Sequence, residues 1–591
     1  MSRQGALGLG PFLDTLERRL GELSAQELRR ALLDRATRLP AAERAGFLAV
    51  FDRPAGVHSD GGAGQPTLLD EIAAFLADVE AGAYVEGWGY DPDYGDHRAF
   101  GDETWTMDMA RLLDQAGHAF LTGDVALARQ AYERLLTALT LEYDEGGFPG
   151  AGTPQELLGR DVDEAKHRCL RAVWEAEPVT DRAAAFVEAA SGLAHVGGHP
   201  SLAAVEATRR EPLPGLDAVL GDLIARLGAV DATRYGFAGQ ALRLLAEATE
   251  RHRGVDGLGE LAHTPGDGQP EASRDWVDGL VRAGRLADAE EAARQMLELL
   301  EPHGPVQATI AERLGALAAV RGDGPAMLRA RQAAWGADPT LERLLDLVDA
   351  AIALGRRDEV LAAEADRAGE GPLAKRTELA AGVLLLAGRV DDAVALLAQA
   401  SPLGWSHSCH PGPVVVPFLL VGGSGAACPE GSLLHELLEG VNAAGWLRYD
   451  FGRDEGVDAF RAALRGAGGV PRSPLGVPRA DLSLSGLLVD TIERRAPGSD
   501  ERARWLDAAR VHVEARVDAV VGGKHRGAYQ RVARLAAACA EALALTSGAS
   551  AGQRLIDDVH ARYPLHSAFR GQLRSAFAAS PLLAPTPARP H

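Results

Sequence analysis

The sequence predicts an all-α protein built from helical hairpins that stack side by side. Apolar residues recur with the period of a helix wherever the chain is not rich in Gly and Pro. Aromatic residues make up only 5% of the chain, while Ala, Leu and Arg are abundant, a composition that favours helices packed closely through small side chains. A length of 591 residues exceeds one ordinary core, so we expect several domains or one extended repeat array.

A short turn that begins with glycine recurs along the middle of the chain. The copies are Gly284-Arg285, Gly322-Asp323, Gly355-Arg356 and Gly388-Arg389, with an isolated copy upstream at Gly123-Asp124. Successive turns of the main group are 38, 33 and 33 residues apart. In spacing and turn chemistry these segments resemble tetratricopeptide repeats (TPR), whose unit of about 34 residues is a pair of antiparallel helices.

Residues at the predicted helix crossings agree with this resemblance. A tetratricopeptide unit carries a small residue five positions after the turn glycine, and Ala128, Ala289 and Ala393 stand there in three of the copies. Met327 and Val360 replace it in the other two. A small side chain lets two helix backbones approach, and stacked hairpins bury faces that no single hairpin could bury. The resemblance therefore implies a tetratricopeptide-like α-solenoid with flanking helical regions.

These signals divide the chain into regions. We expect an N-terminal helical segment (1–80), an acidic aromatic loop (81–104), TPR-like helical repeats (105–400), a loop-rich insertion (401–430) and a C-terminal helical region (431–591) that includes a Pro-rich linker (469–479). The sequence Thr153-Pro-Gln-Glu156 has the pattern of a capping box, which predicts a helix start.

Net charge and cysteine content limit the partner and the compartment. A formal charge of −22 opposes binding to nucleic acid or to anionic membranes, and it favours a basic protein or peptide partner. No stretch reaches the roughly 18 apolar residues of a membrane span, and the N-terminus lacks the pattern of an export signal. The four cysteines are too scattered for a disulfide framework. We expect a soluble, cytoplasmic protein without a cofactor.

A second resemblance covers the C-terminal third. The segments Gly523–Tyr529 and Tyr563–Arg570 are similar to the helical region of uncharacterised bacterial proteins that carry a SWIM zinc finger. The zinc motif of that group needs Cys-x-Cys, which this chain does not contain, so the resemblance implies no metal function. Some members are thought to accompany MoxR-type ATPases. The resemblance therefore implies a regulatory helical subunit of an AAA+ assembly as one alternative.

The densest group of metal-capable side chains lies in the predicted insertion. Its members are His407, Cys409, His410, Cys428 and His435. Zinc prefers thiolate and imidazole ligands in a tetrahedral shell, but the first three residues stand too close together for all of them to ligate easily, and no Cys-x-x-Cys is present. A loop held by hydrogen bonds and packing is the alternative that this spacing favours.

The same region carries a pattern typical of a hydrolase nucleophile. The apolar run Val414–Val421 leads into Gly-Gly-Ser-Gly-Ala, so Ser424 could stand on a sharp strand-to-helix turn with His435 or His512 as its base. Pro417 lies inside the run and argues against a central strand. The alternative is a further helix that ends at the glycines.

One segment differs in composition from the rest of the chain. It is rich in acidic and aromatic residues, and its candidates for partner binding are Trp88, Tyr90, Asp91, Asp93, Tyr94 and Trp105. Exposed Trp and Tyr often anchor protein interfaces. A packed surface loop is the alternative, and a calcium loop is a weaker one, because the segment lacks the Gly and Glu that an EF-hand places at its sixth and twelfth positions.

Three functions follow from these observations. The first is a non-enzymatic protein-interaction scaffold or adaptor built on an α-solenoid, for which no complete catalytic constellation is needed. The second is a metal-dependent or hydrolytic enzyme with its site in residues 401–440. The third is the regulatory subunit of an AAA+ assembly. The oligomeric state stays open, as do the helix faces that would form a concave surface.

Overall fold

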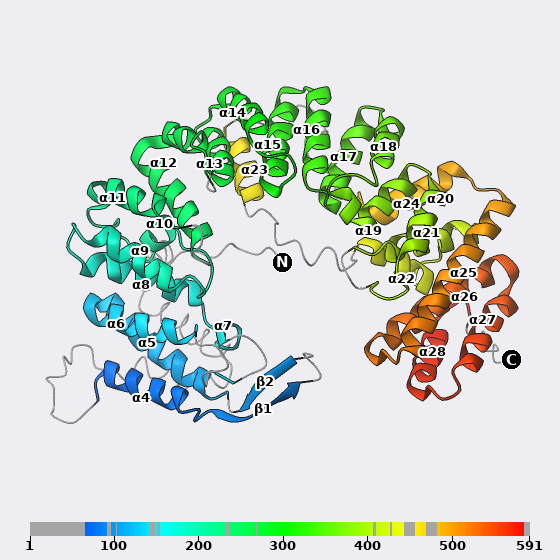
Figure 1. Ribbon diagram of the computed structural model, residues 1–591, viewed down its shortest axis with the longest axis horizontal. Helices are drawn as coiled ribbons and strands as arrows, with labels where there is room; N and C mark the ends of the chain where they lie inside the picture. Colours follow the sequence, from blue (N-terminus) through cyan, green and yellow to red (C-terminus); the bar gives the residue numbers. More distant parts are fainter. Residues whose placement is uncertain are drawn as a thin grey trace, which may run out of the picture. The chain divides into compact units, whose positions relative to one another are not determined.

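Helices form nearly all of the regular structure, which confirms the predicted all-α class (Figure 1). The chain folds into two compact units, Met1–Ala272 (unit 1) and Ser273–His591 (unit 2). Their boundary falls inside the predicted repeat region 105–400. The computed structural model describes residues 66–91, 96–101, 103–140, 148–149, 154–231, 236–266, 269–405, 409–425, 428–442, 456–467 and 482–583.

Unit 1 combines helices of very different length with one pair of strands. Its elements are α4 (Leu68–Glu80), β1 (Val85–Asp91), β2 (Asp96–Gly101), α5 (Trp105–Thr122), α6 (Val125–Ala138), α7 (Pro154–Leu157), α8 (Val162–Ala176), α9 (Arg182–Gly192), α10 (Leu202–Glu206), α11 (Leu216–Gly228) and α12 (Ala238–Ala262). Of the predicted N-terminal segment 1–80, the described part contains α4, which a capping box at Thr67 and Asp70 begins.

The predicted loop at 81–104 is a β-hairpin, which corrects the assignment made from sequence. β1 and β2 pair antiparallel, and Asp91 lies opposite Asp96 at one end of the pairing. Trp88 and Tyr90 alternate with glycine along β1. This two-residue period is a strand signal, but it is short and interrupted by glycines, which are weak strand formers.

Unit 1 has two separate apolar cores. The first joins α4, α5, α6 and one face of α8, and it buries Trp105 and Phe120 completely. The second joins the other face of α8 to α9, α11 and α12, with Trp174 at its centre. Neighbouring residues of α8 serve different cores, because Cys169 belongs to the first and Leu170 to the second. One helix therefore connects two hydrophobic clusters.

Unit 2 is a longer series of helices. Its elements are α13 (Gln269–Arg282, which begins just before the boundary), α14 (Leu286–Leu299), α15 (Pro305–Arg321), α16 (Gly324–Ala337), α17 (Leu341–Ala353), α18 (Arg357–Asp366), η3 (Leu373–Lys375), α19 (Thr377–Leu386), α20 (Val390–Gln399), α21 (Gly412–Ser424), α22 (Leu433–Glu439), η4 (Gly440–Asn442), α23 (Gly456–Gly466), α24 (Leu484–Arg495), α25 (Ser499–Gly522), η7 (Arg526–Ala528), α26 (Tyr529–Ser547), α27 (Ala549–Arg562) and α28 (Ser567–Ala579). The predicted linker 469–479 lies outside the described residues.

The predicted glycine turns join consecutive helices, and this confirms the helical hairpins. They connect α13 to α14, α15 to α16, α17 to α18 and α19 to α20, and the upstream copy connects α5 to α6. Each turn glycine has a positive φ, from 68° to 77° in unit 2 and 89° at Gly123. Glycine enters this left-handed region without the steric penalty that a Cβ would bring, so it ends one helix and lets the next turn back.

The residue after the turn glycine starts the second helix in one of two ways. Asp323 accepts a hydrogen bond from the backbone N–H of Ala326 at 2.9 Å, and Asp124 caps α6 in the same manner. An arginine cannot accept such a bond. In the three Gly-Arg turns the arginine instead pairs with a carboxylate three residues later, as Arg356 does with Glu359.

The predicted loop-rich insertion contains α21, a helix that is buried on all sides. The run 414–421 is therefore helical, and the strand interpretation is wrong. An apolar run without a polar face carries no period that separates helix from strand. Close packing explains the glycines at its end, because a Cβ on Gly422 would lie 2.6 Å from the ring of Trp505 in α25. Gly425, with a φ of 64°, ends the helix.

Unit 2 has one extended apolar cluster, which runs from Ala318 in α15 to Leu583 after α28. α21 packs against α19, α24, α25 and α26, so the predicted insertion lies within this core. Figure 1 shows these helices together in the part of unit 2 that runs from green to red. No helix among the described residues combines the length and the apolar character that a membrane span needs.

In each unit a glutamate from a distant helix caps a short helix. Glu541 of α26 is fully buried and accepts hydrogen bonds from the N–H of Leu434 in α22 (2.8 Å) and from the hydroxyl of Ser580 (2.6 Å). Glu247 of α12 binds the first two N–H groups of α10 at 2.6 and 2.7 Å. A carboxylate stabilises the positive end of a helix dipole, so both glutamates fix tertiary contacts.

Candidate functional site

Of the predicted partner-binding residues, the structure describes the side chain of Trp105. Trp105 is fully buried at the start of α5, where its indole N–H donates to the carbonyl of Pro149 at 2.9 Å and its ring packs on Phe148. Its assignment to a binding surface is therefore corrected: it is a core residue. Trp88 and Tyr90 lie in β1, as does Asp91, and the structure describes only their backbone; Asp93 and Tyr94 lie outside the described residues.

Among the metal candidates in 401–440 that the structure describes, His410 has a local structural role. His410 is largely buried, accepts a hydrogen bond from the N–H of Gly412 at Nδ1 (2.9 Å) and places Nε2 2.6 Å from the carbonyl oxygen of Ser401. A neutral imidazole with its proton on Nε2 satisfies both hydrogen bonds, because Nε2 then donates and Nδ1 accepts. Cys409 is exposed, whereas Cys428 lies 3.8 Å from the hydroxyl of Ser432.

The described residues hold no group of three or more His, Cys, Asp or Glu placed to bind a metal ion. His435 lies in α22, while His407 is outside the described residues. The sequence grouped these side chains because they are close along the chain. Helix α21 separates Cys409 from Cys428, and a helix of 13 residues is about 20 Å long.

Ser424 does not stand on a strand-to-helix turn. It ends α21, is 6% exposed, and donates its hydroxyl hydrogen to the carbonyl of Val421 at 2.7 Å. Among the described residues no imidazole bonds to this hydroxyl; His435 and His512 lie on α22 and α25. A nucleophile elbow needs an exposed serine and a base within hydrogen-bond reach, and the geometry at Ser424 provides neither.

A buried lysine in unit 1 is a group that the sequence did not single out. Lys166 of α8 is fully buried, and its ammonium donates to the carbonyls of Val196 and Gly198 at 2.9 Å each. Burial lowers the pKa of Lys166 to about 8. Perturbed lysines mark many functional sites, but both of these bonds tie α8 to the loop that follows α9. We assign this lysine a structural role.

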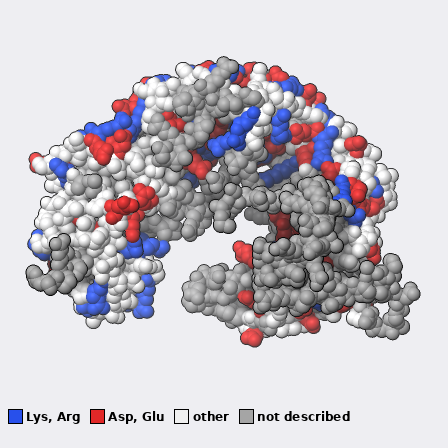
Figure 2. Space-filling view, turned by 180° about the vertical axis from the view of Figure 1, so that it is seen from behind, with Lys and Arg blue, Asp and Glu red and all other residues white. Residues whose placement is uncertain are grey.

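The charges of the chain are distributed unevenly. Residues 66–272 hold 36 Asp and Glu against 16 Lys and Arg, whereas residues 499–583 hold 8 against 12. The net charge of −22 is therefore spread unevenly: unit 1 is acidic, whereas the C-terminal end of unit 2 is basic. On the face drawn in Figure 2, blue side chains gather over the C-terminal helices at lower left.

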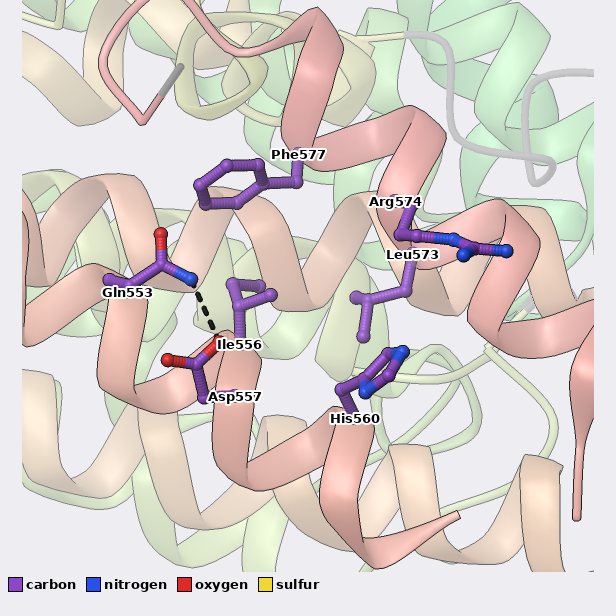
Figure 3. Close-up of a pocket in the computed structure, with 7 residues that line it drawn as sticks. All are labelled: Gln553, Ile556, Asp557, His560, Leu573, Arg574 and Phe577. Atoms are coloured by element: carbon purple, nitrogen blue, oxygen red, sulfur yellow. Dashed lines mark hydrogen bonds between the residues drawn. The ribbon is translucent and has the colours of Figure 1, made fainter. Parts of the chain in front are cut away.

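A pocket lies at this basic end, between the last two helices. It has a volume of about 360 Å³ and is lined by Gln553, Ile556, Asp557 and His560 of α27 and by Leu573, Arg574 and Phe577 of α28. Figure 3 shows the apolar side chains in the middle and the polar ones around them. We call it the α27–α28 groove. Helical periodicity places its residues on facing sides of two helices, but no motif marks them in the sequence.

Known proteins give no argument about the fold or the activity of this chain. No family of known proteins matches the sequence, and no curated protein does. Among solved structures, the chain is similar to the crystal structure of the pentatricopeptide repeat protein PPR10 from maize. The two share 16% sequence identity, the match covers 94% of this chain and 73% of the other, and the TM-score is 0.23. An agreement this low carries no argument about function.

Proposed function

We propose that this protein is a non-enzymatic interaction scaffold that binds a protein or peptide partner on its helical surfaces. The observation that carries the proposal is the series of hairpins from α13 to α20, joined at the four glycine turns. Such an array buries the inner face of each helix pair and leaves extended outer faces for contact with other proteins. The local roles of Ser424 and His410 also support a function without catalysis.

The partner of unit 1 is expected to be basic. Thirty-six acidic against 16 basic residues in 66–272 create a negative potential that attracts a positively charged surface. Asp181, Glu188 and Asp217 illustrate this surface: they are exposed, and they stand at or in α9 and α11, two helices that pack together. A partner bound in this way should dissociate more readily as the salt concentration rises.

Affinity purification from native lysate with quantitative mass spectrometry tests the proposal. The wild-type chain should enrich one or a few proteins, and the variant with Asp181→Asn, Glu188→Gln and Asp217→Asn should recover at least about fivefold less of a basic one, since each lost charge pair weakens association. A matched control neutralises three exposed acids of unit 2, namely Glu298, Glu342 and Asp358. Failure to enrich any protein in several growth conditions would reject the scaffold function.

A further inference from the structure

The α27–α28 groove is an apolar cleft with a charged rim. α27 and α28 both pack on α26 and make little contact with each other, which leaves room between them. Ile556 and Leu573 are buried at its floor, and Phe577 is only half-buried beside them. Figure 3 shows Leu573 and Ile556 facing each other across the groove, with Phe577 above them. Filling such a cleft with apolar side chains removes its surface from water.

The rim of the groove has cations without acidic partners. Arg574, which lines the groove, is exposed and forms no ion pair with any described residue. Arg570 donates to Nε2 of His560 at 2.9 Å and to the carbonyl of Pro564 at 3.0 Å, so it also meets no carboxylate.

The acidic side chains near the groove stand on the other helix. Asp557 accepts a hydrogen bond from Gln553 at 2.8 Å, and Asp558 is exposed next to it on α27. The α28 side of the groove is therefore positive through Arg574, and the α27 side is polar with local negative charge. This asymmetry would orient a charged occupant.

We propose that the α27–α28 groove binds an acidic amphipathic helix of a partner protein. Two splayed helices with an apolar floor offer the packing surface that a third helix needs, with anchor residues at i, i+3, i+4 and i+7. Leu or Phe anchors of the partner fill the space at Ile556, Leu573 and Phe577, while its Asp and Glu side chains face Arg574. The inference rests on the proposed scaffold function and names the chemistry of one partner.

The remaining tail of the chain is a poorer occupant by its own composition. Residues 584–591 read Ala-Pro-Thr-Pro-Ala-Arg-Pro-His, with three prolines, one arginine and no Asp or Glu side chain. Proline opposes helix formation in this tail, and its arginine would meet the cations of α28. A partner segment rich in Glu and Leu satisfies both requirements, so charge complementarity favours it.

Fluorescence anisotropy with a synthetic peptide tests the inference on the full chain. The probe is a labelled amphipathic peptide of about 16 residues with Leu and Phe at the four anchor positions and Glu on the side that would face α28; its control carries Lys in place of Glu. We expect micromolar binding of the Glu peptide, and binding at least about tenfold weaker for the Lys peptide or at high salt. Equal affinity of the two peptides, or no binding of the Glu peptide up to about 100 μM, would overturn the proposal.

Variants of the groove locate the binding site. Arg574→Glu should lower the affinity for the Glu peptide at least about tenfold and raise the affinity for the Lys peptide, because it reverses the charge of the α28 rim. Phe577→Ser should lower the affinity for both peptides, and circular dichroism checks that this variant is folded. Arg526→Glu, at an exposed cation in η7 away from the groove, is the matched control and should change nothing. If Arg574→Glu leaves the affinity unchanged, the groove is not the binding site.

Two further measurements test whether the C-terminal tail or a second copy of the chain occupies the groove instead of a partner helix. Deletion of residues 584–591 should leave the affinity for the Glu peptide unchanged, and a tenfold gain would identify the tail as the occupant. Sedimentation should show no dimer that Arg574→Glu dissociates; such a dimer would identify a second copy. If affinity purification recovers the same partners with Arg574→Glu as with wild type while the peptide fails to bind, the scaffold function stands and the groove assignment falls.

Discussion

Unit 1 and unit 2 use the same helical hairpin, but they bury apolar side chains in different ways. Unit 1 has two cores that meet at α8, while one cluster in unit 2 runs from Ala318 to Leu583. The units also differ in charge, with 44 acidic against 25 basic residues in unit 1 and 39 against 36 in unit 2.

Regular repetition of the helical hairpin accompanies a continuous apolar interior in unit 2. In unit 2 the turns recur every 33 to 38 residues, and the pairs α15–α16, α17–α18 and α19–α20 share one interior. Among its described residues unit 1 has one such turn, at Gly123, and its helices range from the 4 residues of α7 to the 25 of α12, which is broken at Gly254 (φ 69°). The interior of unit 1 divides at α8, where the neighbouring residues Cys169 and Leu170 belong to different clusters.

The largest expected effect comes from deleting one buried ring in each unit. Phe418→Ala in α21 and Phe186→Ala in α9 remove side chains that are both fully buried, and each should cost about 3–5 kcal/mol. Hydrogen exchange should lose protection across many helices of unit 2 in the first variant. In the second the loss should stay within α8 to α12. Lost protection in α5 and α6 of that variant would mean that the two cores of unit 1 are one.

Replacing the two capping glutamates should cost different amounts of stability, because Glu541 is buried more deeply than Glu247. Glu541→Gln leaves a fully buried amide facing an N–H and a hydroxyl, and should cost about 2–3 kcal/mol. The side chain of Glu247 is 22% exposed, so Glu247→Gln should cost only about 1 kcal/mol. Denaturant unfolding followed by hydrogen exchange of α22 and α10 measures both. Equal costs would show that burial does not control the strength of these caps.

Lys166 makes the stability of unit 1 depend on pH. The folded-state pKa of about 8 lies below the ordinary 10.5, so between these values the unfolded chain holds a proton that the folded chain has lost. The free energy of unfolding therefore rises with pH in this window. Relative to Lys166→Met, wild type should gain about 2 kcal/mol between pH 7 and 9.5, measured by exchange of α8. A constant difference across that range would contradict the lowered pKa.

The smallest effects compare the two kinds of hairpin turn. Asp323→Ala removes the hydrogen bond to the N–H of Ala326 and should cost about 1 kcal/mol. Arg356→Ala removes an exposed ion pair with Glu359 and should leave the thermal midpoint unchanged within error. Calorimetry of the two variants measures the difference. A larger loss with Arg356→Ala would show that the Gly-Arg turns depend on their ion pairs.

The predictions from sequence were correct for features that depend on the local sequence alone. The turn glycines were predicted because they recur every 33 to 38 residues, and the helices because apolar residues recur with a period of 3.6. Sequence reasoning left strand and helix open at 414–421, because burial on every side removes the polar face that reveals a period, and it was wrong at Trp105, whose ring finds its partners only in the fold. The hairpin at 85–101 was missed because glycines interrupt its alternation.

The sequence by itself determined the helical class, the positions of the hairpin turns and the excess of acidic residues. These are local or additive properties, which each residue contributes without reference to distant ones. Only the tertiary structure decided that the interior of unit 1 divides at α8, that α21 lies inside the core of unit 2, and that Arg574 stands beside an apolar groove. Those facts depend on which helix faces meet, and the free energy that selects among helix pairings comes from burial summed over residues far apart in the chain.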